Sequence, residues 1–147
     1  MKYLTVEEVK SLSFDKYYEL TQVLTAIDKS DIQNELSKST TVFSYYHGLM
    51  IMQKKRVDLL NIKLLSLYSA IKNNELLSNK SKGVKLTATY LEDFVNSNND
   101  YVAMKEEVLN QEEIYGYLKA LCNALEHKKD MLVQLSANLR SETKLYN

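Results

Sequence analysis

Apolar residues recur at alternating steps of three and four along two long stretches of the chain. The first series runs Phe43, Tyr46, Met50, Gln53, Val57, Leu60, Leu64, Leu67 and Ile71. The second series runs Ile114, Leu118, Leu121, Leu125, Lys128, Leu132, Leu135 and Leu139. This spacing places side chains along one helix face, and series of roughly four heptads are typical of helices that pack along a coiled-coil seam. We therefore predict two long helices whose seams pack against each other or against other copies of the chain.

Polar segments between these series divide the chain further. The run at 78–87 contains Gly83 and has no apolar period, which is typical of a loop. Shorter apolar series before residue 30 predict short N-terminal helices, of which the second has an apolar face of Phe14, Tyr17, Leu20, Leu24 and Ile27. The predicted elements are short helices within 1–30, a long helix over 31–77, a loop over 78–87, a short helix over 88–98 and a second long helix over 100–143.

Capping residues support several of these helix starts. Thr5 begins a capping-box pattern, and Ser30 with Gln33 forms a second one at the start of the first long helix. Thr87 or Thr89 is a suitable N-cap for the short helix. These side chains predict where the helices begin.

The composition favours helices throughout. The chain has 147 residues, which is the length of one domain, and contains no proline and only three glycines. An isolated pair of helices buries little surface, so we expect the N-terminal helices to pack on the pair or several copies to associate. The predicted fold class is all-α: a single domain in which a long helical hairpin carries short N-terminal helices and a short helix between its two arms.

The residues that enzymes need are missing from the pattern. There is no glycine-rich phosphate loop and no cluster of cysteine and histidine, and neither His47 nor His127 has a nucleophile or second metal ligand beside it in sequence. Cys122 lies in an apolar run, which is typical of a small core residue. The sequence therefore predicts a protein that is not an enzyme and uses no cofactor or metal.

Charge is balanced overall but segregated along the chain. There are 19 basic and 19 acidic residues. Residues 54–85 contain eight basic and two acidic side chains, a local excess of six positive charges. Residues 92–113 contain seven acidic side chains and one lysine, a local excess of six negative charges. A second basic group, His127, Lys128, Lys129 and Arg140, is on the last helix, where an antiparallel hairpin would bring it near Lys54–Arg56.

Two interpretations of the basic residues remain open. A basic run on a helix is most often a solvated face. Alternatively, the residues form a band that neutralises phosphates, with Tyr45, Tyr46 or Tyr68 stacking on exposed bases, although tyrosine at helical spacing is more often a core residue. Lys128 within a seam either extends its ammonium out of loose packing or marks a place open to an anionic ligand or an acidic partner.

The C-terminal half resembles a known family. A lysine-rich loop is followed by a helix that begins at threonine, LTATYLEDFVNSN, and then by a long helix containing EIYGYLKALCNALEHKKDML and VQLSANLRSE. This order of features resembles the small helical phage recombination mediators of the UvsY type, which help a RecA-like recombinase to load onto coated single strands. The residues that carry the likeness are Tyr115, Gly116, Leu118, Cys122, Ala124, Leu125, Lys128, Lys129, Leu139, Arg140 and Glu142.

The resemblance implies a ring-forming homo-oligomer that binds single-stranded DNA and contacts both a RecA-like recombinase and a single-strand-binding protein. It implies DNA contacts from the long helix before the loop, where this chain has Lys54, Lys55, Arg56 and Lys63. The full set of candidate nucleic-acid contacts is Lys54, Lys55, Arg56, Lys63, Lys80, Lys82, Lys85, Lys128, Lys129 and Arg140.

The predicted function is therefore phage recombination mediation in the cytoplasm of the host cell. No stretch approaches the roughly 20 apolar residues of a membrane span, and glutamates occur near the start where a secretory signal would be apolar, so no membrane role is expected. The alternative is a coiled-coil structural or interaction protein with no nucleic-acid role, in which the seams are the whole function. Regulation of an enzyme by helix docking is a third possibility, supported only by the amphipathic helices.

Overall fold

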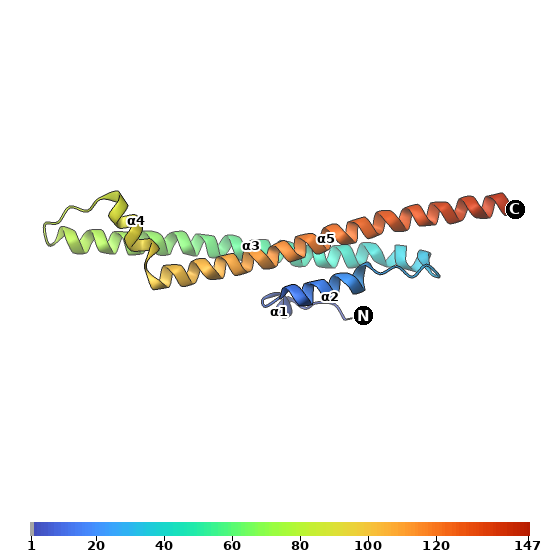
Figure 1. Cartoon of the computed structure of the whole chain (residues 1–147), viewed down its shortest axis with the longest axis horizontal. Coiled ribbons are helices and arrows are strands. Elements are labelled where there is room, and N and C mark those ends of the chain that lie inside the picture. Colours follow the sequence, from blue (N-terminus) through green and yellow to red (C-terminus); the bar gives the residue numbers. More distant parts are fainter. Residues whose placement is uncertain (1) are drawn as a thin grey trace. The chain divides into compact units, whose positions relative to one another are not determined.

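The chain is all-α, as the sequence predicts. The structure is a computed structural model, and it describes residues 2–147, among which there is no strand. The helices, labelled in Figure 1, are α1 (Val6–Val9), α2 (Phe14–Thr25), α3 (Ile32–Lys80), α4 (Ala88–Asn96) and α5 (Asn99–Tyr146).

Capping side chains begin the helices, mostly at the predicted residues. The Thr5 hydroxyl accepts a hydrogen bond from the Glu8 backbone N–H, and the Glu8 carboxylate accepts one from the Thr5 N–H at 2.8 Å. At α4 the cap is Thr87, whose hydroxyl accepts the Tyr90 N–H at 3.2 Å. Both predictions are confirmed.

The predicted capping box at the start of α3 is wrong. The Asp31 carboxylate accepts the Asn34 N–H at 3.3 Å, which makes Asp31 the capping side chain. Ser30 instead donates its hydroxyl to Asp28, and the Gln33 side chain donates to the Ser136 hydroxyl at 3.1 Å. A carboxylate is the stronger acceptor at a helix N-terminus, where backbone N–H groups carry partial positive charge.

The first long helix continues beyond its predicted end. It extends to Lys80, three residues past the expected boundary, and a turn follows in which Gly83 has φ 71°. Side chains with a Cβ rarely adopt this left-handed conformation, so Gly83 allows the chain to reverse at this point. The connection to α4 is accordingly shorter than the predicted loop.

The chain folds as two compact units, each described by itself. Unit 1 comprises residues 2–53 and 114–147, and unit 2 comprises residues 54–113. Helices α3 and α5 each contribute a segment to both units. The sequence contains no glycine- or proline-rich linker at this division, but the segregated charges of 54–85 and 92–113 lie within unit 2.

Unit 1 has a well-packed core. Its buried residues come from the N-terminal segment and from α2, α3 and α5; they are Leu4, Val9, Leu12, Leu20, Leu24, Tyr46, Leu49, Ile114, Leu118, Leu121, Cys122 and Leu125. Tyr46 is fully buried, and its hydroxyl accepts the Leu4 N–H at 3.2 Å, while Tyr45 donates its hydroxyl to the Leu4 carbonyl at 2.6 Å. Two aromatic side chains thus hold the N-terminal segment against α3.

Unit 2 has a smaller core. Its buried apolar residues are Val57, Leu91, Val95 and Val108. A polar contact joins the short helix α4 to the end of α3, since Tyr90 donates its hydroxyl to the Glu75 carboxylate at 3.0 Å. The Asn79 amide, which is also on α3, donates to the same carboxylate at 2.8 Å. Because few large side chains are buried, this unit gains less stability from apolar burial than unit 1.

The predicted seam residues are buried to different extents. Tyr46, Val57, Leu118, Leu121, Leu125 and Leu132 are buried, and Phe43, Met50, Leu60, Leu64 and Leu135 are half-buried. Leu139 differs from the others because it is 47% exposed. Within the chain, the C-terminal seam therefore ends before Leu139.

Candidate nucleic-acid interface

The α3 segment of unit 2 carries the KKR run that the sequence singled out. Lys54, Lys55 and Lys63 are exposed, whereas Arg56 is half-buried and interacts within the chain. Lys54 is 3.5 Å from the Asp58 carboxylate one turn later, and exposed pairs of this kind contribute little to stability. Lys55 and Lys63 form no ion pair among residues 2–147, so their charges remain available to an anionic ligand.

The turn after α3 adds three lysines to the same unit. Lys80, Lys82 and Lys85 are exposed on either side of Gly83 and form no ion pair among the described residues. Beside them is an open pocket of about 630 Å³, lined by Leu76, Leu77, Lys80, Gly83, Val84, Lys85 and Leu86. No carboxylate lines this pocket, and its two charged lining residues are both lysines.

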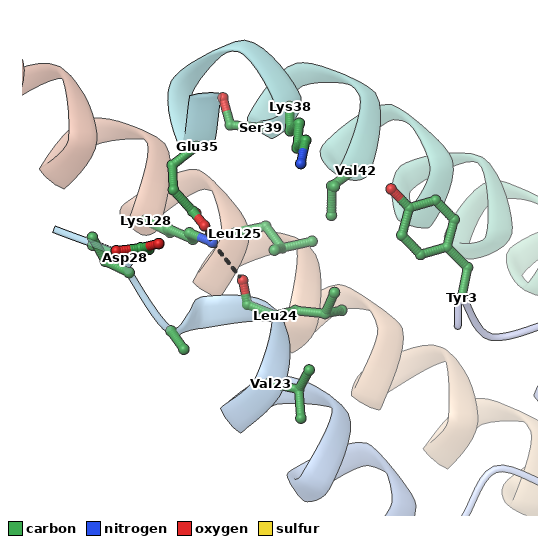
Figure 2. A pocket seen from close by; sticks show the side chains of 12 residues that line it. Tyr3, Val23, Leu24, Asp28, Glu35, Lys38, Ser39, Val42, Leu125 and Lys128 are labelled. Carbon is green, nitrogen blue, oxygen red and sulfur yellow. Dashed lines mark hydrogen bonds and ion pairs between the residues drawn. The ribbon is translucent and has the colours of Figure 1, made fainter. Parts of the chain in front are cut away.

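Lys128 has a different role from the one predicted. Its ammonium is 2.8 Å from the Glu35 carboxylate and donates a hydrogen bond to the Leu24 carbonyl at 2.9 Å, as Figure 2 shows. The side chain is only 14% exposed. Leu24 is in the last turn of α2, where backbone carbonyls carry partial negative charge and favour a cation. The ammonium is thus occupied inside unit 1, and we exclude Lys128 from the candidate DNA contacts.

A pocket of about 590 Å³ adjoins this ion pair in unit 1. Its lining includes both acidic and basic side chains, Asp28 and Glu35 as well as Lys38 and Lys128, together with apolar residues such as Val42 (Figure 2). Because the charges of opposite sign are mixed, the pocket offers no net attraction to a polyanion.

The remaining predicted basic contacts are also in unit 1. Lys129 and Arg140 are exposed on α5 and form no ion pair among residues 2–147. The expected continuous band would join them to Lys54–Arg56, which belongs to unit 2, and that arrangement stays a prediction. Each unit therefore contributes its own group of available cations.

The tyrosines proposed for base stacking are largely committed to packing. Tyr46 is fully buried, and its desolvation raises the pKa of its hydroxyl. Tyr45 is half-buried against Tyr46 with ring centroids 5.3 Å apart, and Tyr68 is half-buried against Tyr101 at 5.9 Å. All three rings thus contact other aromatic side chains of the chain and are at least half-buried, whereas single-strand binders stack bases on exposed rings.

A different aromatic group is exposed in unit 1. Phe14 and Tyr18 are both more than half exposed and stack with ring centroids 6.1 Å apart. Tyr17 stacks on Tyr117 at 5.1 Å beside them. The helical spacing predicted one apolar face that includes Phe14, but of the residues of α2 only Leu20 and Leu24 are buried. Spacing alone does not tell how wide the buried face of a short helix is.

Two features of the described residues bear on chemistry, the buried thiol of Cys122 and the spacing of metal-binding side chains. Burial raises the pKa of the Cys122 thiol to about 11, so the thiol stays protonated at neutral pH and is a poor nucleophile. Among residues 2–147, no three His, Cys, Asp or Glu side chains are grouped as metal ligands. In the same range, no helix combines the length and apolar character that crossing a bilayer requires.

Comparison with known proteins adds no relative: no family model matches the chain, and neither a curated protein nor a solved structure matches it. Function therefore has to be inferred from the surfaces of the chain itself.

Proposed function

We propose that the protein is a phage recombination mediator that binds single-stranded DNA through unit 2. The observation that carries the proposal is the group of five exposed lysines on α3 and the following turn that form no ion pair among the described residues, Lys55, Lys63, Lys80, Lys82 and Lys85. The likeness of the C-terminal half to UvsY-type mediators supports the same function. The proposed partners are single-stranded DNA, a RecA-like recombinase and a single-strand-binding protein in the host cytoplasm.

The proposed mechanism depends on several copies acting together. A lysine–phosphate contact is weak and sensitive to salt, and on single strands each neutralised phosphate lowers log affinity by about 0.7 per decade of salt. Several copies in a ring would raise the effective concentration of lysines along one strand. The strand would then be held where coating protein is displaced and the recombinase can nucleate.

The test is fluorescence anisotropy with a labelled oligo-dT of about 30 nucleotides, a length that spans more than one binding site. The test variant replaces Lys80, Lys82 and Lys85 with alanine, which removes three available cations. A matched control replaces Lys2, Lys16 and Lys29, which are exposed in unit 1 and carry the same total charge. Helix content of both variants is checked by circular dichroism.

We expect the test variant to bind at least about tenfold more weakly and the control to bind almost normally. The slope of log affinity against log salt concentration should be smaller in the test variant by roughly 2. Equal losses in both variants would show that only net charge matters and would contradict an interface on unit 2. Absence of binding by the unmodified protein even at low salt would refute the DNA function itself.

One observation favours the alternative, a coiled-coil interaction protein without a nucleic-acid role. Large apolar side chains are exposed along the outer face of α3 in unit 2, among them Leu59, Ile62 and Leu65. Such a surface is expected of a protein that assembles through its helices. If the anisotropy experiment shows no binding, assembly becomes the primary function.

A further inference from the structure

Unit 2 exposes a row of large apolar side chains on α3. We call this row the outer stripe; it consists of Leu59, Ile62, Leu65, Leu76 and Leu77, which are 50, 60, 68, 38 and 65% exposed. The steps of three between Leu59, Ile62 and Leu65 keep them on neighbouring positions of one helix side. Val57, which is buried, lies on the side that faces the core. The outer stripe is therefore a second apolar surface, separate from the seam.

Single exposed leucines are ordinary, but a row of five in one small unit is not. Unit 2 buries only four apolar residues, so it exposes more large hydrophobic side chains on α3 than it has in its core. Covering the outer stripe would add apolar burial to a unit that has little, at about 25 cal/mol for each Å² removed from water. The outer stripe is therefore the kind of exposed apolar surface that proteins bury on association.

A complementary surface is present on α5 of the same unit. Val102 and Leu109 are exposed, seven residues apart, and Glu106 lies between them on the same helix side. Glu112 lies one turn beyond Leu109. We call these four residues the acidic stripe. Glu106 and Glu112 form no ion pair among residues 2–147.

The two stripes match in charge as well as in apolar spacing. Lys55 and Lys63 are one helical turn before and after Leu59, so they flank the outer stripe. Their segment, 54–85, has an excess of six positive charges, and 92–113 has an equal negative excess. Neither lysine is paired inside its own copy. Helices with an apolar row and flanking charges of opposite sign associate selectively, because like-charged arrangements are penalised.

We propose that the outer stripe of one copy packs against the acidic stripe of a second copy. Both stripes are exposed in their own copy, so a neighbouring copy is the partner that presents the matching surface. The two stripes differ, so the contact is heterologous. In a pair, one copy keeps its acidic stripe free and the other keeps its outer stripe free. Repetition of the contact gives a closed ring or an open chain. The inference rests on the surfaces of unit 2 and does not depend on DNA binding. In the assembled form Lys55 and Lys63 face carboxylates of the neighbouring copy, and Lys80, Lys82 and Lys85 stay exposed for phosphates.

Sedimentation velocity without nucleic acid tests the contact over a series of protein concentrations. Variant A replaces Ile62 and Leu65 with glutamine, and variant B replaces Val102 and Leu109 with glutamine. All four side chains are exposed, so both variants should keep their helix content and melting temperature. A matched control replaces Val23 and Val133, which are exposed apolar residues of unit 1, with glutamine.

We expect the unmodified protein and the control to sediment as oligomers and each variant alone as a 17.0 kDa monomer. Variant A retains the acidic stripe and variant B retains the outer stripe. An equimolar mixture should therefore form a dimer of one A and one B that grows no further. This complementation is specific to a heterologous contact.

Three outcomes would overturn the proposal. The unmodified protein could remain a monomer at every concentration, which would mean that the outer stripe serves another partner. Variant A or variant B could still form the full oligomer. The mixture could remain monomeric although both variants are folded. Because no DNA is present, none of these results bears on nucleic-acid binding.

Discussion

Unit 1 and unit 2 share the same two long helices but use their apolar residues in opposite ways. Unit 1 buries a cluster of twelve side chains drawn from the N-terminal segment, α2, α3 and α5. Unit 2 buries four apolar side chains and exposes five large ones on α3 alone. The comparison shows that a long helix need not have one function along its length: it contributes to a core in one unit and offers a contact surface in the other.

The largest expected effect compares one leucine from each unit. Leu118 is completely buried in unit 1, so Leu118→Ala should lower the free energy of unfolding by about 3–5 kcal/mol through lost apolar burial and an unfilled cavity. Leu60 is half-buried in unit 2, and Leu60→Ala should cost only about 1 kcal/mol. Urea unfolding followed by circular dichroism measures both. Equal losses of unfolding free energy in the two variants would contradict the view that apolar burial stabilises unit 1 more than unit 2.

A smaller effect concerns the ion pair in unit 1. Lys128→Met should destabilise the protein by about 2 kcal/mol, because it leaves the Glu35 carboxylate and the Leu24 carbonyl without their donor. The value is below that of a fully buried pair because Glu35 is 25% exposed. Lys54→Ala breaks the exposed pair with Asp58 and should change stability by less than about 0.5 kcal/mol. Similar changes in stability for the two substitutions would show that the buried ion pair of Lys128 stabilises the protein no more than the exposed pair of Lys54.

The smallest effect at neutral pH comes from Cys122. Its pKa is raised to about 11 in the folded state by burial, above the value of an exposed thiol. Below pH 8 the thiol is protonated in both states and contributes no pH dependence. Between about pH 9 and 11 the unfolded state loses the proton first, so stability should fall by about 1–2 kcal/mol.

Cys122→Ala provides the reference for this pH dependence, because lysines and tyrosines titrate in the same range. The relevant quantity is the difference in unfolding free energy between the unmodified protein and the variant, measured from pH 7 to pH 10.5. That difference should shrink as the pH rises. A constant difference would show that the thiol is accessible to solvent in the folded state.

Local signals in the sequence predicted the helices and some of their caps. Thr5 and Thr87 each accept a hydrogen bond from a backbone N–H only three residues later, so their capping can be predicted from the local sequence. The all-α fold follows from the apolar spacing and from the absence of helix-breaking residues. The helix α3 begins within one residue of its predicted start, but its capping residues were predicted wrongly. The Gln33 side chain donates instead to Ser136, which is 103 residues away in the sequence, and local spacing does not reveal such a contact.

Candidate contacts were predicted less well, for a physical reason. Lysine is compatible both with a solvated face and with an internal ion pair, and only the position of Glu35 relative to Lys128 decides between them. The outer stripe was missed because α3 has two apolar rows. The spacing identifies both, but which row is buried depends on the helices that pack against it.

The contacts of Lys128 also limit when this part of the fold can form during protein synthesis. Lys128 and its acceptor Leu24 are 104 residues apart, so no nascent chain shorter than 128 residues can make this contact. The core that α2 and the first part of α3 share also includes Ile114, Leu118, Leu121, Cys122 and Leu125 of α5. On the ribosome, the first helices would therefore emerge with part of their apolar sides open until α5 follows.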